Sequence, residues 1–406
     1  MFEWEQEPYA TGYNFQISNT YTFNEILLDT NLYNLLFIDK NYLEWEKQYF
    51  WRVKPIFENN YSNEWINTKS FFIANSISNE IENFEVEIYD ENLIEDEITL
   101  FSSWYDERSI AFNKYGKEIW NTGDTKKFIV HIDKYSQLYG FKYPNDANEG
   151  YQNNVLMKSN FDNLTLKSYE EKRFNRHECK ELPNGNFLAL QNINTLGPIP
   201  LGSWTQDFRN LGYQADGQTL EIDWSSQDIV ELNQSGEEVW RWKFLDYFFS
   251  KEEYDIYGGT WEKALLYGYY DWTHINAFYF DERDNSIYIS VRNLSRITKL
   301  QYPSGEIIWN MGHESASGEV TFGHDLDFSY QHSISLTDED NILIFDNGNY
   351  SDQFWGQDST SRALEISVSG SGGEYSADIA WQYVLPYNLY GPESGNVQKL
   401  VNGNYL

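Results

Sequence analysis

Short apolar segments alternate with polar turns along most of the chain. The segments are rich in Ile, Val, Phe, Tyr and Trp, the turns are rich in Asn, Gly and Asp, and helical periodicity is scarce. Alternation over such short stretches is typical of β-strands joined by tight turns. The pattern predicts an all-β protein.

Two short motifs recur along the chain. The first is a strand that runs from Gly to Trp, and its copies are 116–120, 236–240 and 305–309, with a degenerate copy at 378–381. The second is a strand, a tight polar turn and another strand, and its copies are 182–188, 280–288, 336–343 and 400–406. Asn-Gly turns suit hairpins because both residues tolerate a positive φ. Together the two motifs predict a repeating unit of four strands.

The clearest unit runs from His274 to Gly312. Its predicted strands are 274–280, 287–292, 296–301 and 306–311. Four antiparallel strands that recur every roughly 40 to 70 residues are typical of β-propeller blades with insertions. Residues 101–406 are therefore predicted to form a β-propeller. Residues 1–100 lack both motifs and are assigned to a separate β-rich, sandwich-like amino-terminal domain.

The carboxyl end of the chain falls in the second strand of a further unit, at Leu406. A propeller closes its ring to hide the edges of its strands. We therefore expect a propeller that is truncated in its last blades. The alternative is a ring that an amino-terminal strand closes.

The charge of the chain restricts its partners. The 406 residues include 29 Lys and Arg against 63 Asp and Glu, a formal net charge of −34. Such a charge repels phosphate polyanions and anionic membrane surfaces, so neither a nucleic-acid nor a membrane partner is expected. A site for a small anion must gather positive side chains locally against this field.

Three of the six histidines precede a turn motif in the same way. His177, His274 and His332 each stand at the head of the predicted first strand of a unit. Because the first strand of every propeller blade lines the central channel, the three imidazoles are expected to converge. Arg292 ends the second strand of the His274 unit and could reach the same place. Three imidazoles and a guanidinium suit a tetrahedral oxyanion such as sulfate or phosphate.

The sequence at this point resembles the PAPS-independent arylsulfate sulfotransferases. The similarity covers roughly residues 105–406 and rests on segments 271–276, 290–292, 305–309, 331–332, 344–348 and 361–365. It implies a six-bladed propeller with an amino-terminal β-domain. It also implies an enzyme that moves a sulfuryl group from an aryl sulfate to a phenolic acceptor through a sulfated histidine, without a cofactor.

The resemblance also assigns roles by position. His332 resembles the nucleophile of the family, while His274, Arg292 and His177 resemble its other three active-site residues. Neutral imidazole can attack sulfur and leave again, and a guanidinium can stabilise the oxygens of the transferred group. Either His177 or His274 would give a proton to the departing phenolate and later take one from the acceptor.

Several points stay open on the sequence alone. Asn293 stands where many relatives have a further His, and the acidic amino terminus lacks the pattern of a signal peptide, although the resemblance implies a periplasmic or secreted protein. A homodimer is one open arrangement. Segment 346–349 is interpreted as a turn rather than a calcium site. The rival functions are an aryl sulfate hydrolase and a propeller that binds anionic ligands without reaction.

Overall fold

The computed structural model describes residues 1–58, 64–78, 90, 93–104, 106–133, 135–143, 154–246, 261–314, 318–356 and 358–406. Contacts divide the chain into two compact units. Unit 1 comprises residues 1–148 and 155–168, and unit 2 comprises residues 149–154 and 169–406. The protein is mostly β, with several four-stranded antiparallel sheets.

Unit 1 contains one four-stranded sheet in the order β3-β2-β5-β6 and a three-stranded sheet in the order β7-β8-β9. The strands of these sheets are β2 (Gly12–Ser18), β3 (Ile26–Leu32), β5 (Gln48–Ile56), β6 (Ile66–Phe72), β7 (Ile98–Ser102), β8 (Ser109–Asn113) and β9 (Glu118–Asn121). In β5 every second side chain is buried, and Trp51 and Val53 pack with Phe15 of β2 in an aromatic core. The alternation follows from the period of a strand.

The remaining strands of unit 1 are short. They are β1 (Phe2–Glu3), β4 (Leu36–Phe37), β10 (Lys127–Ile132), β11 (Leu138–Lys142) and β12 (Asn154–Ser159), whose first residue belongs to unit 2. The predicted domain boundary after residue 100 falls inside β7, which pairs with β8 from Ile98 to Ser102. The division into domains 1–100 and 101–406 stays a prediction.

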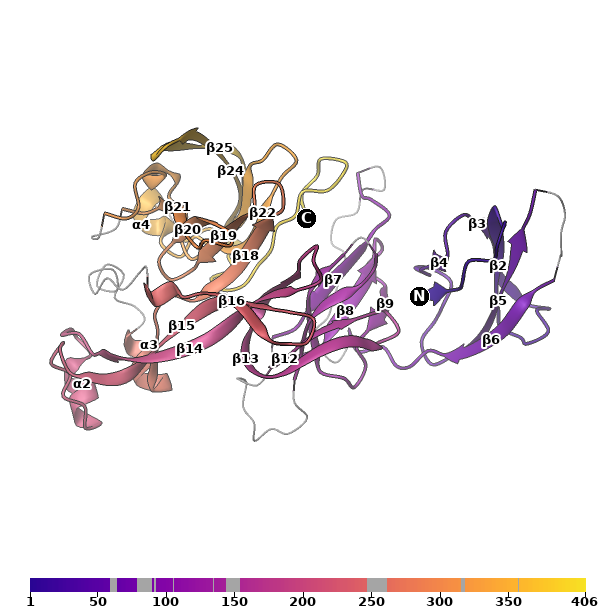
Figure 1. Ribbon diagram of the computed structural model, residues 1–406, viewed down its shortest axis with the longest axis horizontal. Coiled ribbons are helices and arrows are strands. Elements are labelled where there is room, and N and C mark those ends of the chain that lie inside the picture. Colours follow the sequence, from indigo (N-terminus) through magenta and orange to yellow (C-terminus); the bar gives the residue numbers. More distant parts are fainter. Residues whose placement is uncertain are drawn as a thin grey trace. The chain divides into compact units, whose positions relative to one another are not determined.

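Unit 2 contains three successive sets of antiparallel strands in chain order (Figure 1). The second and third sets are separate four-stranded sheets, whereas the strands of the first set are part of an eight-stranded sheet. The first set is β13 (Thr165–Glu181), β14 (Phe187–Pro198), β15 (Leu220–Leu232) and β16 (Glu238–Trp242), and β17 (Tyr269–Asp271) adds to β15 in parallel. The second is β18 (Ile275–Asp281), β19 (Ser286–Val291), β20 (Arg296–Gln301) and β21 (Ile307–Gly312). The third is β22 (His332–Leu336), β23 (Ile342–Asp346), β24 (Arg362–Ser371) and β25 (Glu374–Val384). In each set, strands that are neighbours in sequence are neighbours in space.

The second set confirms the four-strand unit predicted from the sequence. Each of its strands begins and ends within one residue of the predicted bounds. The three hairpins pair antiparallel, with a register shift in the first and the third. The predicted polar turns have the expected backbone, since Gly185, Asn285, Asp340 and Gly403 all have φ between 52° and 86°. Gly and Asn adopt this conformation at little cost.

Neighbouring sheets in unit 2 share apolar cores. Every residue of β19 is buried. Ile287 and Ile289 pack into a core with the first set of strands, including Trp242, whereas Tyr288 faces the core shared with Ile342 of the third set. Because side chains of a strand alternate between the two faces of its sheet, β19 is covered on both faces.

Helices are few among the described residues. They are α2 (Thr205–Asn210), α3 (Trp261–Tyr267) and α4 (Ser351–Trp355), with short 3-10 segments at Phe244–Asp246, His324–Leu326 and Tyr387–Leu389. None of these described helices has the length and apolar character that a membrane crossing requires.

Candidate active site

The four predicted site residues all lie in unit 2. His332 is the first residue of β22, His274 directly precedes β18, and Arg292 directly follows β19, as the motif spacing predicts. His177 differs, because it lies inside β13, a 17-residue strand that begins at Thr165. The prediction that His177 stands at the head of a strand is therefore wrong. His177 nevertheless lies shortly before the turn that joins β13 to β14, as the sequence motif predicts.

Buried amide side chains connect the sheets that carry these residues. The Asn276 side chain of β18 donates to the backbone carbonyl of Gln331 at 2.8 Å. The fully buried Gln331 side chain donates in return to Ser290 Oγ at 3.1 Å and to the Arg296 carbonyl at 3.1 Å. These bonds hold the start of β22 against β19, so the position of His332 relative to Arg292 is set by a hydrogen-bonded network rather than by a loop.

His332 is held in one tautomer. Its Nδ1 lies 2.7 Å from Asn347 Oδ1, and the amide nitrogen of Asn347 donates to the carbonyls of Gly391 and Ser394, both at 2.7 Å. Because two carbonyls accept from that nitrogen, the Asn347 oxygen faces the ring and Nδ1 must carry the hydrogen. The lone pair of His332 is therefore on Nε2.

Burial lowers the pKa of His332 to about 3, and the charges of Arg292 and His274 act in the same direction. The hydrogen bond that His332 Nδ1 donates to Asn347 opposes this shift but is weaker than the cost of burying the charged ring. His332 is therefore neutral at physiological pH, which is the state that a nitrogen nucleophile needs.

His274 and His177 face each other. Their Nε2 atoms are 3.3 Å apart and their rings meet edge to face, with centroids 5.0 Å apart. The Nδ1 of His274 is hydrogen-bonded to the carboxylate of Asp271, and the Nδ1 of His177 to the side-chain oxygen of Asn175. Burial lowers the pKa of His177 well below its ordinary value, and His274, His332 and Arg292 add to this effect.

Arg292 is buried between polar and aromatic neighbours. Its Nη1 donates to Asn293 Oδ1 at 2.8 Å, and its guanidinium lies 4.5 Å from the centroid of the Tyr330 ring. Asn293 in turn donates to the backbone carbonyl of Asp271 at 2.6 Å. Asn293 thus joins the arginine to the loop that carries His274. A guanidinium is a strong ligand for an oxyanion because its N–H donors match the geometry of the oxygens.

The charges around Asp271 offset its burial. Burial alone would raise the pKa of this half-buried carboxyl, but His274 and Arg292 outweigh it and lower the pKa below the ordinary value. Asp271 is therefore ionised and can only accept hydrogen bonds. It is a permanent negative charge next to His274.

The backbone at the site is strained. His274 has φ of 50°, and the residues on either side of the Gln331–His332 pair, Tyr330 and Ser333, have φ of 56° and 62°. Non-glycine residues adopt this left-handed region at a cost of roughly 1 kcal/mol or more each. Such conformations occur where the surrounding structure holds side chains in a required orientation. Here they set the orientation of His274 and His332.

Sequence reasoning missed the residues that orient the histidines. These are Asn175, Asp271 and Asn347. Asn347 belongs to the segment interpreted as a turn, where the carboxylate of Asp346 accepts from the Ser329 and Gly348 backbone nitrogens at 2.9 Å each and pairs with the Arg362 Nε at 2.8 Å. The sequence did contain a signal for Asn347. It is a polar residue directly after an apolar strand, and that strand pairs with the strand of His332.

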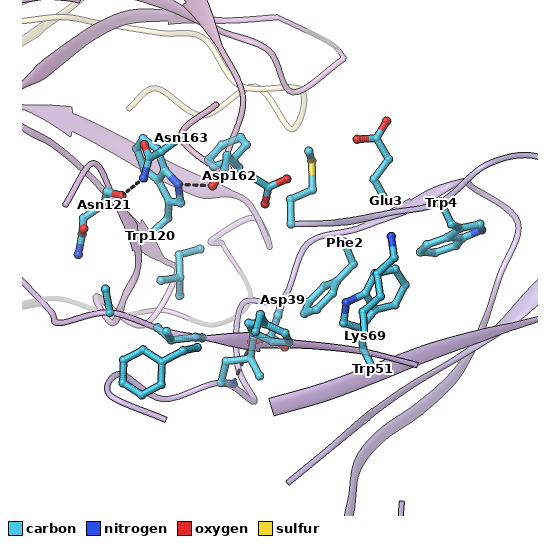
Figure 2. A pocket seen from close by; sticks show the side chains of 18 of the residues that line it. Phe2, Glu3, Trp4, Asp39, Trp51, Lys69, Trp120, Asn121, Asp162 and Asn163 are labelled. Atoms are coloured by element: carbon cyan, nitrogen blue, oxygen red, sulfur yellow. Dashed lines mark hydrogen bonds between the residues drawn. The ribbon is translucent and has the colours of Figure 1, made fainter. Parts of the chain in front are cut away.

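The other histidines of unit 2 have different hydrogen-bond partners, and unit 1 has a cavity of its own. His313 and His324 are hydrogen-bonded to backbone carbonyls, of Phe328 at 2.7 Å and Gly312 at 3.0 Å. This cavity in unit 1 has a volume of about 1070 Å³. Figure 2 shows side chains that line it, among them Trp120, which donates to the Phe161 carbonyl at 2.6 Å. Among the described residues that line it, none is a predicted site residue.

The sheets and the cluster together define a β protein with a buried group of three imidazoles and a guanidinium, suited to an oxyanion. A family model described as arylsulfotransferase (ASST) matches residues 212–406. The match covers 195 of the 406 residues, and over this part the chain is similar to the arylsulfotransferase family. The match includes His274, Arg292 and His332, whereas His177 lies outside it.

Comparisons with whole proteins add little. No curated protein matches the chain. Among solved structures, a protein of unknown function from Bacteroides caccae is 8% identical, with 70% of this chain and 72% of that chain covered and a TM-score of 0.36. Hsv2 of Kluyveromyces lactis is 8% identical, with 82% and 92% covered and a TM-score of 0.31. Likeness at these TM-scores supports no conclusion.

Proposed function

We propose that the protein transfers a sulfuryl group from an aryl sulfate to a phenolic acceptor by a ping-pong mechanism with a sulfohistidine at His332. The match of residues 212–406 to the arylsulfotransferase family model supports the class of reaction. The observation that carries the mechanism is the state of His332, which is buried and neutral, with its lone pair on Nε2 because Nδ1 is bonded to Asn347.

In the first half-reaction, His332 Nε2 attacks the sulfur of the donor. The nitrogen–sulfur bond forms, the bond from sulfur to the aryl oxygen breaks, and the departing oxygen takes a proton from one of His177 and His274. Arg292 binds the sulfuryl oxygens and stabilises their charge as the bonds change, a contribution of several kcal/mol in sites of this kind. Asn347 accepts a hydrogen bond from the Nδ1 of the sulfated ring, which carries a positive charge.

In the second half-reaction, an acceptor phenol takes the place of the first. The same imidazole removes the phenolic proton, the phenol oxygen attacks sulfur, and the nitrogen–sulfur bond breaks to restore neutral His332. The balance of atoms and charges requires no nucleotide and no metal ion. The partners are therefore an aryl sulfate and a phenol.

We also propose that unit 2 forms part of a six-bladed β-propeller. Two successive four-stranded antiparallel sheets in chain order, β18–β21 and β22–β25, support it, as does the burial of β19 on both faces. In this arrangement β18 and β22 are the innermost strands of adjacent blades, and the residues at their heads face the central channel.

Incubation with a chromogenic aryl sulfate, with and without added phenol, tests the function. We expect phenol to increase release of the chromophore, and intact-mass measurement to detect a sulfuryl adduct that is absent from His332→Ala. His131→Ala, a histidine change in unit 1, is the matched control and should retain both. Release that does not depend on phenol would identify a hydrolase, and binding without turnover would identify a non-catalytic binding module.

A further inference from the structure

The contact between His177 and His274 raises the question of which ring nitrogens carry hydrogens. Two neutral imidazoles can form a hydrogen bond only when a hydrogen on one nitrogen faces a lone pair on the other. Here the facing atoms are the two Nε2 atoms, 3.3 Å apart. The positions of the hydrogens therefore depend on what each Nδ1 does.

The Nδ1 of each ring is committed as a donor. For His274, the partner of Nδ1 is the ionised carboxylate of Asp271, which can only accept. For His177, the partner is Asn175 Oδ1, which also accepts from the His177 backbone N–H at 2.9 Å. A backbone N–H can only donate, so the Asn175 atom that faces both groups is its oxygen. Asn192 accepts from the nitrogen of the same amide at 2.8 Å, which agrees with this orientation.

With both Nδ1 atoms protonated, two neutral rings would place two Nε2 lone pairs against each other. A single additional proton converts this repulsion into an N–H···N bond. We propose that His177 and His274 hold one proton between their Nε2 atoms, and that Asp271 is the positioning residue whose charge keeps it on His274. The inference rests on the proposed function and decides which imidazole acts as the acid.

The charges around the pair favour His274 as the carrier. Asp271 contacts His274 directly, whereas His177 faces the positive groups Arg176 and Arg292 and the ring of His332. Arg292 and Lys263 also lower the pKa of Asp271, so its carboxylate stays ionised beside His274. During sulfuryl transfer the proton passes from His274 Nε2 to the aryl oxygen as the sulfur–oxygen bond breaks, and the lone pair remains on the nitrogen.

The variant Asp271→Asn tests the assignment because the amide oxygen can still accept from Nδ1 while the charge is lost. Single-turnover release should fall roughly 100-fold for phenyl sulfate, whose phenol is about as basic as tyrosine, since it needs the acid most. Release from para-nitrophenyl sulfate, a better leaving group, should fall less than about 3-fold. The alkaline limb of the pH profile should move to lower pH. Asp340→Asn, an exposed change of the same charge, is the control.

Two outcomes would overturn the proposal. One is an equal loss on both donors with an unchanged pH profile, which a purely structural role of Asp271 would produce. The other comes from NMR of the ring nitrogens of isotope-labelled histidine in the unreacted protein. We expect the proton of the pair to be released at a pH roughly one unit lower in Asp271→Asn, and no shift would contradict the shared proton. Because NMR needs no turnover, failure of the sulfotransferase function leaves this test intact.

Discussion

At the scale of the residue, side chains that orient the imidazoles matter as much as the imidazoles. Neutral histidine has two tautomers, and only the one with a lone pair on Nε2 can attack from the side opposite Asn347. Asn347 selects this tautomer with its oxygen and is itself held by two backbone carbonyls. In the proposed mechanism, the reactivity of His332 therefore depends on Asn347, which acts through the ring of His332 and not on the sulfuryl group.

Substitution of Asn347 should separate tautomer selection from stability. Asn347→Leu and Asn347→Asp both lose the donated hydrogen bonds, each worth about 1 kcal/mol, but only Asp keeps an acceptor for His332 Nδ1. We expect the rate of adduct formation to fall roughly 100-fold in the Leu variant and clearly less in the Asp variant. Intact-mass measurement over time gives both rates. Equal rates in the two variants would exclude a role in tautomer selection.

At the scale of the element, the turn after β23 has little room. Gly348 follows Asn347 with φ of 67°, and a Cβ built on it would lie 1.9 Å from the Thr360 carbonyl oxygen. Gly356, which ends α4 with φ of 63°, has no atom within 4 Å of the same position. The two glycines share a backbone conformation and differ in their surroundings.

This pair of glycines gives a controlled test of the turn. Gly356→Ala should lower the free energy of unfolding by about 1 kcal/mol, the cost of a left-handed alanine. Gly348→Ala should lower it by roughly 3 kcal/mol or more, because the clash with backbone adds to that cost, and should also slow sulfation of His332. Denaturant titration of both variants measures the difference. Similar losses in stability would show that the turn adapts.

At the scale of the whole molecule, the charge of the chain opposes its proposed substrate. The formal net charge is −34. The site, by contrast, contains the buried Arg292 and, as we propose, one proton shared by His177 and His274. Long-range repulsion acts on the approach of an aryl sulfate, while the local cluster acts after arrival. The two effects respond differently to salt.

Salt should therefore speed the first half-reaction. Raising the ionic strength from 0.01 M to 0.15 M shortens the Debye length from roughly 30 Å to about 8 Å, so kcat/KM for the donor should rise about 3-fold. Sulfuryl transfer to a neutral phenol from the adduct serves as the control and should change little. A fall in kcat/KM with salt would mean that the positive cluster governs the approach as well.

Sequence patterns predicted the parts of this protein that depend on local order. The strands of the set β18–β21 and the left-handed turns at Gly185 and Asn285 follow from alternation and turn chemistry, which act over a few residues. The phase of His274 and His332 relative to their strands was predictable for the same reason. The domain boundary after residue 100 and the closure of the propeller stay predictions.

What only the tertiary structure decided are the contacts between distant residues. His177 and His274 are 97 positions apart and meet through Nε2, and Asn347 reaches His332 from the end of the neighbouring strand. Hydrogen-bond partners of this kind depend on how the sheets pack and on which amide oxygen faces which ring. Neither produces a periodic pattern of residues in the sequence. The sequence determined which residue types are present at the site, and packing decided which nitrogen of each histidine carries a hydrogen.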